Sequence, residues 1–256
     1  MIALARRVLR RVGPVAARLL PANVVWPVAV CVSRWAARVL EACGVRHPWG
    51  LRLEEFLLAE ALTALSRGGA RFPVMVEVER EAELAALCRR EPKLLALSVH
   101  VPLNRLFLRR LREWGRTVQV VVRKFDGPVW GLGERLDRIV YSPHVFLDIR
   151  RALEGSSVVF LAMDGLCSRE ADGGYTAEVS PSVLRFAHRS RTPLLVYRTL
   201  LDSSGRGRVV WAEGGDPKAP YEELVRQCRH AFERVYAQPH DPRVRWLRAS
   251  EGRREG

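Results

Sequence analysis

The order of hydrophobic and polar residues along the chain predicts helices and strands that alternate. Residues 51–66 carry apolar side chains at helical spacing, and residues 74–78 follow the pattern of a strand. Helices are further predicted at residues 81–90, 104–114, 143–154, 182–190 and 221–236, and strands at residues 93–99, 118–122, 158–163, 194–197 and 208–213. Strands that alternate with helices form sheets with parallel crossovers. The pattern therefore predicts an α/β fold in which helices cover both faces of a mostly parallel central sheet.

The first 46 residues differ in composition from the rest, with eight arginines and a single acidic residue. The longest uncharged stretch, residues 19–33, is shorter than the roughly 20 residues that a helix needs to cross a bilayer, and two prolines interrupt it. No convincing cleavage site follows, so a secretory signal is not expected. A basic, amphipathic segment with Trp26 and Trp35 at its ends is predicted to lie in the membrane interface. The alternative is a pair of helices that pack against the core.

The rest of the chain is predicted to form one α/β domain over residues 47–247, followed by a charged tail over residues 248–256. A chain of this length can bury a sizeable core, and its composition is that of a folded protein. The five cysteines are scattered, which predicts neither a disulfide framework nor a metal-binding knuckle. A reducing cytoplasm is the simplest setting for them.

The charge balance narrows the candidate partners. The chain carries 42 Lys and Arg residues against 28 Asp and Glu residues, which gives a net charge of +14. Nearly all of the excess is arginine, whose planar guanidinium binds phosphate oxygens in pairs. Anionic lipid head groups, acidic carrier proteins and nucleic acid are the candidate partners, and a genome bias toward arginine codons is the other explanation. Nucleic acid is the least favoured, because the sequence contains no recognisable stacking platform, recognition helix or zinc module.

His100 is the best single candidate for chemistry. It directly follows the predicted strand at residues 93–99, and open α/β sheets bind ligands outside the carboxyl ends of their strands. A neutral imidazole at that place can take a proton from a hydroxyl nucleophile. The alternative is a partly buried histidine that is satisfied by a backbone carbonyl.

Several pieces of the sequence follow one another in an order that is typical of one family. The order begins with residues 72–78, a short helix and the strand that ends at His100. The remaining pieces are Arg123, Asp126 and Pro128 after the next strand, Arg138 fifteen residues beyond the first arginine, Gly155 at the end of a helix, Asp164 after a strand, and the segments 191–196 and 242–247. In this order and spacing, residues 51–247 resemble the bacterial lipid A late acyltransferases, the lauroyl and myristoyl transferases of the lysophospholipid acyltransferase superfamily.

The resemblance implies transfer of a fatty acyl group from an acyl thioester, on acyl carrier protein or coenzyme A, to a hydroxyl of a membrane glycolipid or lysophospholipid. It also implies a glycerolipid acyltransferase-like fold, no metal, no cofactor besides the thioester co-substrate, and a peripheral location on the cytoplasmic face of the bacterial inner membrane. His100 would be the general base, and backbone N–H groups after Val99 would stabilise the oxyanion. The implied substrate-binding residues are Asn104, Arg105, Arg123 and Arg138. For the last two, the alternative is a solvated basic face.

One position departs from the family pattern H-x4-D/E, because residue 105 is an arginine where the pattern has an acid. A carboxylate would fix the tautomer of the imidazole and stabilise its charged form, whereas a cation beside the ring would oppose protonation. Three hypotheses follow: Asp164 replaces the missing acid, His100 acts unassisted, or the protein is a catalytically inactive, lipid-binding relative. His144 and Asp148 come one residue short of the pattern, and as neighbours on one helix face they are more typical of a surface pair.

Overall fold

The computed structural model describes residues 2–45, 52–69, 71–122, 137–169, 175–237 and 242–246. Within these residues, seven strands form the main sheet in the order β1-β9-β8-β2-β5-β3-β4. The strands are β1 (Val76–Val78), β2 (Leu94–Ser98), β3 (Val118–Val122), β4 (Asp137–Val140), β5 (Val158–Ala162), β8 (Leu194–Leu201) and β9 (Gly207–Glu213). Every neighbouring pair is parallel except β8 and β9. The predicted mostly parallel sheet is confirmed.

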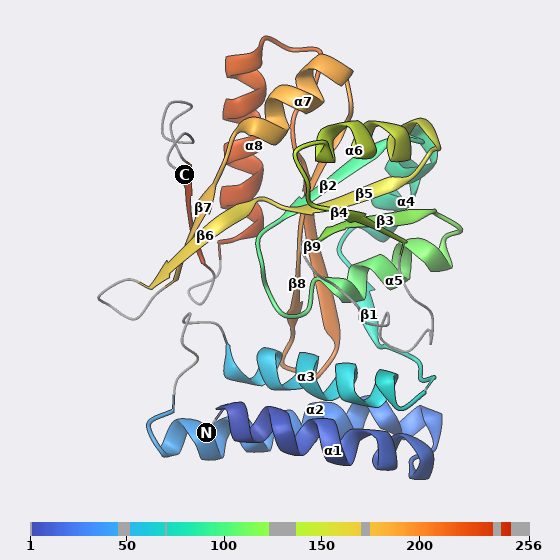
Figure 1. Cartoon of the computed structure of the whole chain (residues 1–256), viewed down its shortest axis with the longest axis vertical. Helices are drawn as coiled ribbons and strands as arrows, with labels where there is room; N and C mark the ends of the chain where they lie inside the picture. Colours follow the sequence, from blue (N-terminus) through green and yellow to red (C-terminus); the bar gives the residue numbers. More distant parts are fainter. Residues whose placement is uncertain are drawn as a thin grey trace.

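Helices cover both faces of this sheet (Figure 1). The helices α4 (Glu81–Arg90) and α5 (Arg105–Glu113) lie on one face, and α6 (Val145–Glu154), α7 (Ser182–Ser190) and α8 (Tyr221–Val235) lie on the other. All five residues of β2 are buried, as expected for a central strand that is covered on both sides. Leu94 and Ala96 belong to the apolar cluster under α4 and α5, whereas Leu95 and Leu97 belong to the cluster under α6, α7 and α8. The predicted α/β layering is therefore confirmed.

A layer of three helices covers one end of the molecule, below the sheet in Figure 1. The helices are α1 (Ile2–Leu19), α2 (Ala22–Ala42) and α3 (Leu53–Arg67). Side chains of α2 and α3 pack in one apolar cluster with Leu103, Leu106 and Leu201. Trp26 of α2 is buried in this cluster, and its indole N–H donates to the carbonyl of Gly205 at 2.9 Å. The expectation that Trp26 lies in a membrane interface is therefore wrong, because the inner face of α2 packs against the domain.

The outer face of the same layer is apolar as well. In the described part of the chain, no helix is both long and apolar enough to span a bilayer. The exposed large side chains nevertheless recur at intervals of three and four residues, so that each of the two helices has one outward apolar stripe. These residues are Val8, Val12, Val15 and Leu19 on α1, and Val28, Val32, Trp35 and Val39 on α2. We call them the outer apolar face.

A second, smaller sheet was not predicted from the sequence. It has the order β10-β7-β6, formed by β6 (Asp164–Arg169), β7 (Tyr175–Val179) and β10 (Arg243–Trp246). Only Met163 separates β5 from β6, so the apolar pattern of residues 158–163 gives no sign that a new strand begins. Trp246 packs edge-on against Phe232 of α8, with ring centroids 5.6 Å apart. The small sheet therefore lies beside α8, and its first residue is Asp164.

Candidate active site

The pairing of β2 with β5 places a histidine and an aspartate opposite each other. Ser98 is the register partner of Ala162, and the N–H of Met163 donates to the Ser98 carbonyl at 2.8 Å. Two residues further on, Nδ1 of His100 lies 2.9 Å from Oδ1 of Asp164. The backbone N–H of His100 donates to the same oxygen, also at 2.9 Å. The His100 side chain is 68% exposed, whereas that of Asp164 is 0% exposed.

This geometry determines what the imidazole can do. A carboxylate oxygen accepts hydrogen bonds, so Nδ1 of His100 carries the hydrogen and Nε2 keeps its lone pair. The Nε2 lone pair belongs to an exposed ring that lines a pocket, whereas the carboxylate of Asp164 is fully buried. A buried carboxylate that orients an accessible imidazole is the arrangement used for general-base catalysis. The sequence-based hypothesis that Asp164 could stand in for the missing acid is thus compatible with the distance between the two groups.

Two buried side chains form hydrogen bonds with the backbone of Val99, the residue before the candidate histidine. The N–H of Val99 donates to the Tyr236 hydroxyl at 3.0 Å, and that hydroxyl donates to the carbonyl of Tyr197 at 3.0 Å. The amide of Asn104 donates to the Val99 carbonyl at 3.0 Å and accepts the N–H of Thr199 at 2.9 Å. The amide of Asn104 therefore supports the backbone. Asn104 also lines the cavity, and its contact with substrate stays a prediction.

Tyr236 contributes to the site from the far end of the chain, and sequence reasoning missed it. Burial raises the pKa of its phenol, so the hydroxyl stays neutral and can both donate and accept. The residue directly follows α8, where the sequence shows only the apolar spacing of a core helix. Nothing in that pattern indicates that its hydroxyl reaches the end of β2.

The backbone N–H groups near the candidate histidine are already engaged. The N–H of His100 donates to Asp164, and the N–H of Val101 donates to the Val99 carbonyl at 2.8 Å. Both groups belong to the turn that was expected to supply the oxyanion donors. That expectation is wrong for these two groups, because an N–H with a good partner cannot turn to a developing oxyanion without losing it.

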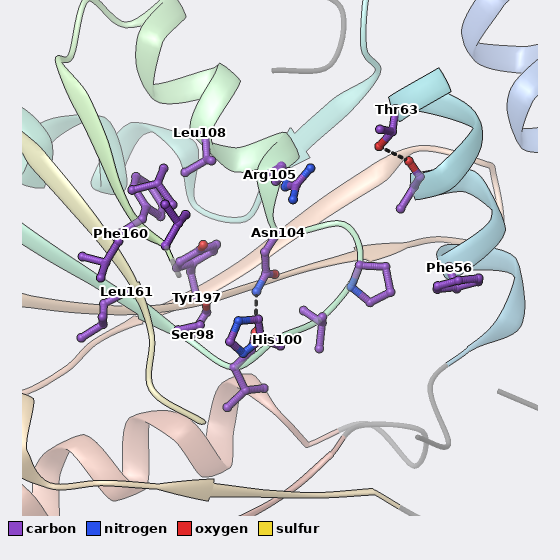
Figure 2. Close-up of a pocket in the computed structure, with 18 of the residues that line it drawn as sticks. Phe56, Thr63, Ser98, His100, Asn104, Arg105, Leu108, Phe160, Leu161 and Tyr197 are labelled. Atoms are coloured by element: carbon purple, nitrogen blue, oxygen red, sulfur yellow. Dashed lines mark hydrogen bonds between the residues drawn. The ribbon is translucent and has the colours of Figure 1, made fainter. Parts of the chain in front are cut away.

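A cavity of about 320 Å³ opens beside His100, between α3, the start of α5 and the ends of β2, β3 and β5 (Figure 2). This volume lies near the lower end of the range for small-molecule sites. The two ends of the cavity differ in chemistry. The end over the sheet is apolar and is lined by Leu108, Val120, Val122, Phe160, Leu161 and Ala162, whereas the end at α3 carries Glu60, Thr63 and Arg105.

Arg105 belongs to the α3 end of the cavity. Burial lowers the pKa of its guanidinium to about 10; Glu60 opposes that shift and Arg67 adds to it. The group therefore remains charged at neutral pH. In Figure 2, Asn104 lies between Arg105 and His100. The cation in the position of the family acid thus interacts with charged groups of α3, whereas the acidic neighbour of the imidazole is Asp164, which follows β5.

Of the other candidate residues, the described ones, Arg138, His144 and Asp148, do not line the cavity. Arg138 is exposed on β4, an edge strand that β5 and β3 separate from β2. Arg123, Asp126 and Pro128 lie outside the described residues. His144 is exposed just before α6, and Asp148 pairs with Arg151 at 3.5 Å, a different partner from the His144 that the surface-pair interpretation expects. Among the described residues, no group of three or more His, Cys, Asp or Glu side chains gathers in a way that could hold a metal ion.

Comparison with known proteins finds neither a family model nor a curated protein that matches the chain. The resemblance to lipid A acyltransferases therefore stays a prediction. Function has to be inferred from the chemistry of the cavity, above all from the exposed imidazole and its buried carboxylate.

Proposed function

We propose that this protein is an acyltransferase that moves a fatty acyl group from an acyl thioester to a hydroxyl of a membrane glycolipid or lysophospholipid. The observation that carries the proposal is the 2.9 Å contact between Nδ1 of the exposed His100 ring and the buried Asp164 carboxylate. The donor would be acyl carrier protein or coenzyme A, as the resemblance to the lipid A late acyltransferases implies. An imidazole at the mouth of a partly apolar cavity suits a reaction between an alcohol and a lipid thioester.

The reaction can be followed atom by atom. Nε2 of His100 takes the proton of the acceptor hydroxyl as its oxygen attacks the thioester carbonyl carbon, so that a C–O bond forms and a tetrahedral oxyanion appears. The Asp164 carboxylate stabilises the imidazolium that results. Collapse of the intermediate breaks the C–S bond, and the leaving thiolate takes the proton back from the imidazolium. The products are an ester and a thiol, and the imidazole is regenerated.

Arg105 supplies positive charge at the α3 end of the cavity, away from its apolar end. The acceptor's phosphates and the phosphopantetheine of either donor are anionic, and a guanidinium binds phosphate oxygens in pairs. With a pKa of about 10, Arg105 is charged at the pH at which acyl transfer would be assayed. We assign it to binding of the anionic part of a substrate, at a distance from the reacting hydroxyl.

The outer apolar face supports a location at a membrane surface. Its two stripes are accompanied by exposed arginines, namely Arg7, Arg11, Arg18 and Arg38. Apolar side chains can enter the acyl region while the guanidinium groups stay with anionic head groups. The layer that carries this face also forms one wall of the cavity through α3. We propose a peripheral position on the cytoplasmic face of the bacterial inner membrane, which would bring the cavity close to its lipid acceptor.

The direct test is an acyl-transfer assay with purified protein, thioester donors on carrier protein and on coenzyme A, and a panel of radiolabelled lipid acceptors. The expected result is transfer of label into a more heavily acylated lipid with at least one pair of donor and acceptor. Failure of the wild-type protein with every pair would overturn the assignment as an enzyme.

A lipid-binding protein without catalysis is the alternative. Arg105 favours it, because the acid of the family motif is absent from that position. The two functions give opposite results in one comparison of lipid binding and turnover. Binding of the acceptor to vesicle-bound protein without any turnover would favour the alternative, whereas turnover that depends on His100 would exclude it.

A further inference from the structure

The apolar end of the cavity is a slot formed by small side chains next to the candidate histidine. Ser98 of β2 and Ala162 of β5 are register partners, so both side chains lie on the face of the sheet that α5 covers. Both residues line the cavity. Because neither side chain is large, the space above this pair stays open between the sheet and α5, where larger side chains would fill it.

The next row of the sheet closes the slot. Two residues earlier along each strand, Ala96 is the partner of Phe160, and Phe160 is the partner of Val120 on β3. The ring of Phe160 packs edge-on against Tyr197 with centroids 5.3 Å apart, and against Phe107 with centroids 5.9 Å apart. A ring held on two sides forms a firm floor, so the depth of the slot is set by this one side chain.

The walls of the slot suit an uncharged chain. Leu108 of α5 covers it from above and Val120 lines its side. Two hydroxyls, those of Ser98 and Tyr197, lie at the slot, and burial raises the pKa of the Tyr197 phenol, so that this group stays uncharged. Among the described lining residues, the charged groups are Glu60 and Arg105, both at the α3 end of the cavity. Burying an apolar chain is therefore favourable at the sheet end and costly at the α3 end.

We infer that the slot binds the fatty acyl chain of the donor, with the thioester near His100 and the chain end toward Phe160, and that Phe160 limits the chain length. The inference deepens the proposed function and rests on it for the identity of the ligand as an acyl donor. A hydrocarbon chain is the ligand class that matches a slot with apolar walls and an apolar floor, and the polar parts of donor and acceptor are left to the α3 end.

Fatty acids offer a probe that does not depend on catalysis. Saturated fatty acids from octanoate to stearate are tested for binding to the full-length protein by displacement of a fluorescent fatty acid. Affinity for the wild-type protein should rise by about fourfold for each methylene group that enters the slot and then stop rising, because a buried methylene contributes about 0.8 kcal/mol. The length at which the rise stops measures the depth of the slot.

Phe160→Ala should move this limit toward longer chains, since removing the ring opens the next row, about 6.6 Å further along the strands. Phe160→Leu should give a smaller shift in the same direction and protects the test against poor folding of the alanine variant. The matched control is Phe146→Leu. Phe146 stacks on Phe186 at the exposed surface of α6 and does not line the cavity, so its replacement should leave the limit unchanged.

Ala162→Leu tests the slot from its other end. A larger side chain beside Ser98 should fill the entrance and weaken binding of fatty acids of every length by about tenfold or more, because a well-packed site does not take extra methylenes without strain. Equal limits for wild type, Phe160→Ala and Phe160→Leu would overturn the inference, as would equal shifts in the Phe160 and Phe146 variants or the absence of saturable binding.

The two proposals can fail separately. A wild-type protein that shows the predicted length limit in binding but transfers no acyl group would overturn the acyltransferase assignment and leave the slot assignment supported. A protein that transfers acyl groups with a length preference that Phe160 variants do not change would support the acyltransferase and overturn the slot.

Discussion

The sheet side and the α3 side of the cavity, which we call the helix side, differ in the elements that build them and in the charged groups that they hold. On the sheet side, Asp164 is buried and receives two hydrogen bonds from His100, in an arrangement set by the pairing of β2 with β5. On the helix side, Arg105 and Glu60 come from α5 and α3, two helices joined through side-chain packing. The acid for an imidazole can therefore come from a neighbouring strand, while residue 105, the acidic position of the family motif, holds a cation. We assign proton transfer to the sheet side and anion binding to the helix side.

The largest expected effect comes from removing the imidazole. His100→Ala should lower the rate of acyl transfer by about 10²- to 10⁴-fold, since loss of a general base typically costs this much. The measurement is the initial rate of transfer from an acyl thioester to a radiolabelled lipid. His144→Ala is the matched control, because that histidine is exposed at the start of α6 and lies outside the cavity. Equal rates for wild type and His100→Ala would remove His100 from the mechanism.

The next effect comes from the carboxylate on the sheet side. Asp164→Asn should lower kcat by about 10²-fold or more with little change in KM, because an amide does not stabilise the imidazolium and can select the wrong tautomer. Asp148→Asn on α6 serves as the control for the same chemical change at the surface. An unchanged kcat in the Asp164→Asn variant would show that His100 acts unassisted.

A combined exchange sharpens the contrast between the two sides. When Arg105→Asp is added to Asp164→Asn, the acid of the family motif returns at residue 105, on the helix side. We expect no recovery of kcat above the single Asp164→Asn variant, because the residue at position 105 faces Glu60 and Arg67 of α3. Recovery to within about tenfold of wild type would mean that both positions can reach the imidazole, and would contradict the division between the sides.

The helix side should affect binding more than turnover. Arg105→Gln should raise KM for the anionic substrate by about 10- to 100-fold with kcat nearly unchanged, the loss expected for one hydrogen-bonded charge contact. The control is Arg150→Gln, which removes an arginine that pairs with Glu154 on the exposed face of α6. If Arg105→Gln lowers kcat and leaves KM unchanged, the guanidinium acts in the chemical step and the assignment of the helix side is wrong.

The smallest expected effect lies on the outer apolar face, beyond the helix side of the cavity. Trp35 is 67% exposed on α2, and Trp35→Glu should weaken binding to anionic vesicles by about tenfold through loss of apolar burial and added negative charge. Vesicle co-sedimentation measures this effect, and Leu147→Glu on α6 is the control at an exposed leucine elsewhere. An equal loss of vesicle binding in both variants would mean that the outer apolar face does not bind the membrane specifically.

Much of the main fold could be predicted from the chain alone, because its elements have strong local signals. The predicted helices at residues 81–90 and 182–190 agree with α4 and α7, and the predicted strand at residues 118–122 agrees with β3. The short strands β4, β6, β7 and β10 were missed, since four to six residues are too few for a period to stand out, even where polar and apolar residues alternate as in β10. Trp26 was misplaced for a related reason: composition cannot distinguish an apolar face that packs inward from one that faces a membrane.

Local sequence patterns were enough to predict the α/β class and to place His100 at the end of one strand and Asp164 at the end of another. They left the partner of the imidazole open, because two residues 64 positions apart meet only through the order and register of strands. Strand order placed β2 beside β5, and register then set Asp164 opposite His100. The roles of Tyr236, Asn104 and Phe160 were decided by tertiary structure in the same way, since hydrogen bonds to a distant backbone and the depth of a cavity arise only when separate elements pack together.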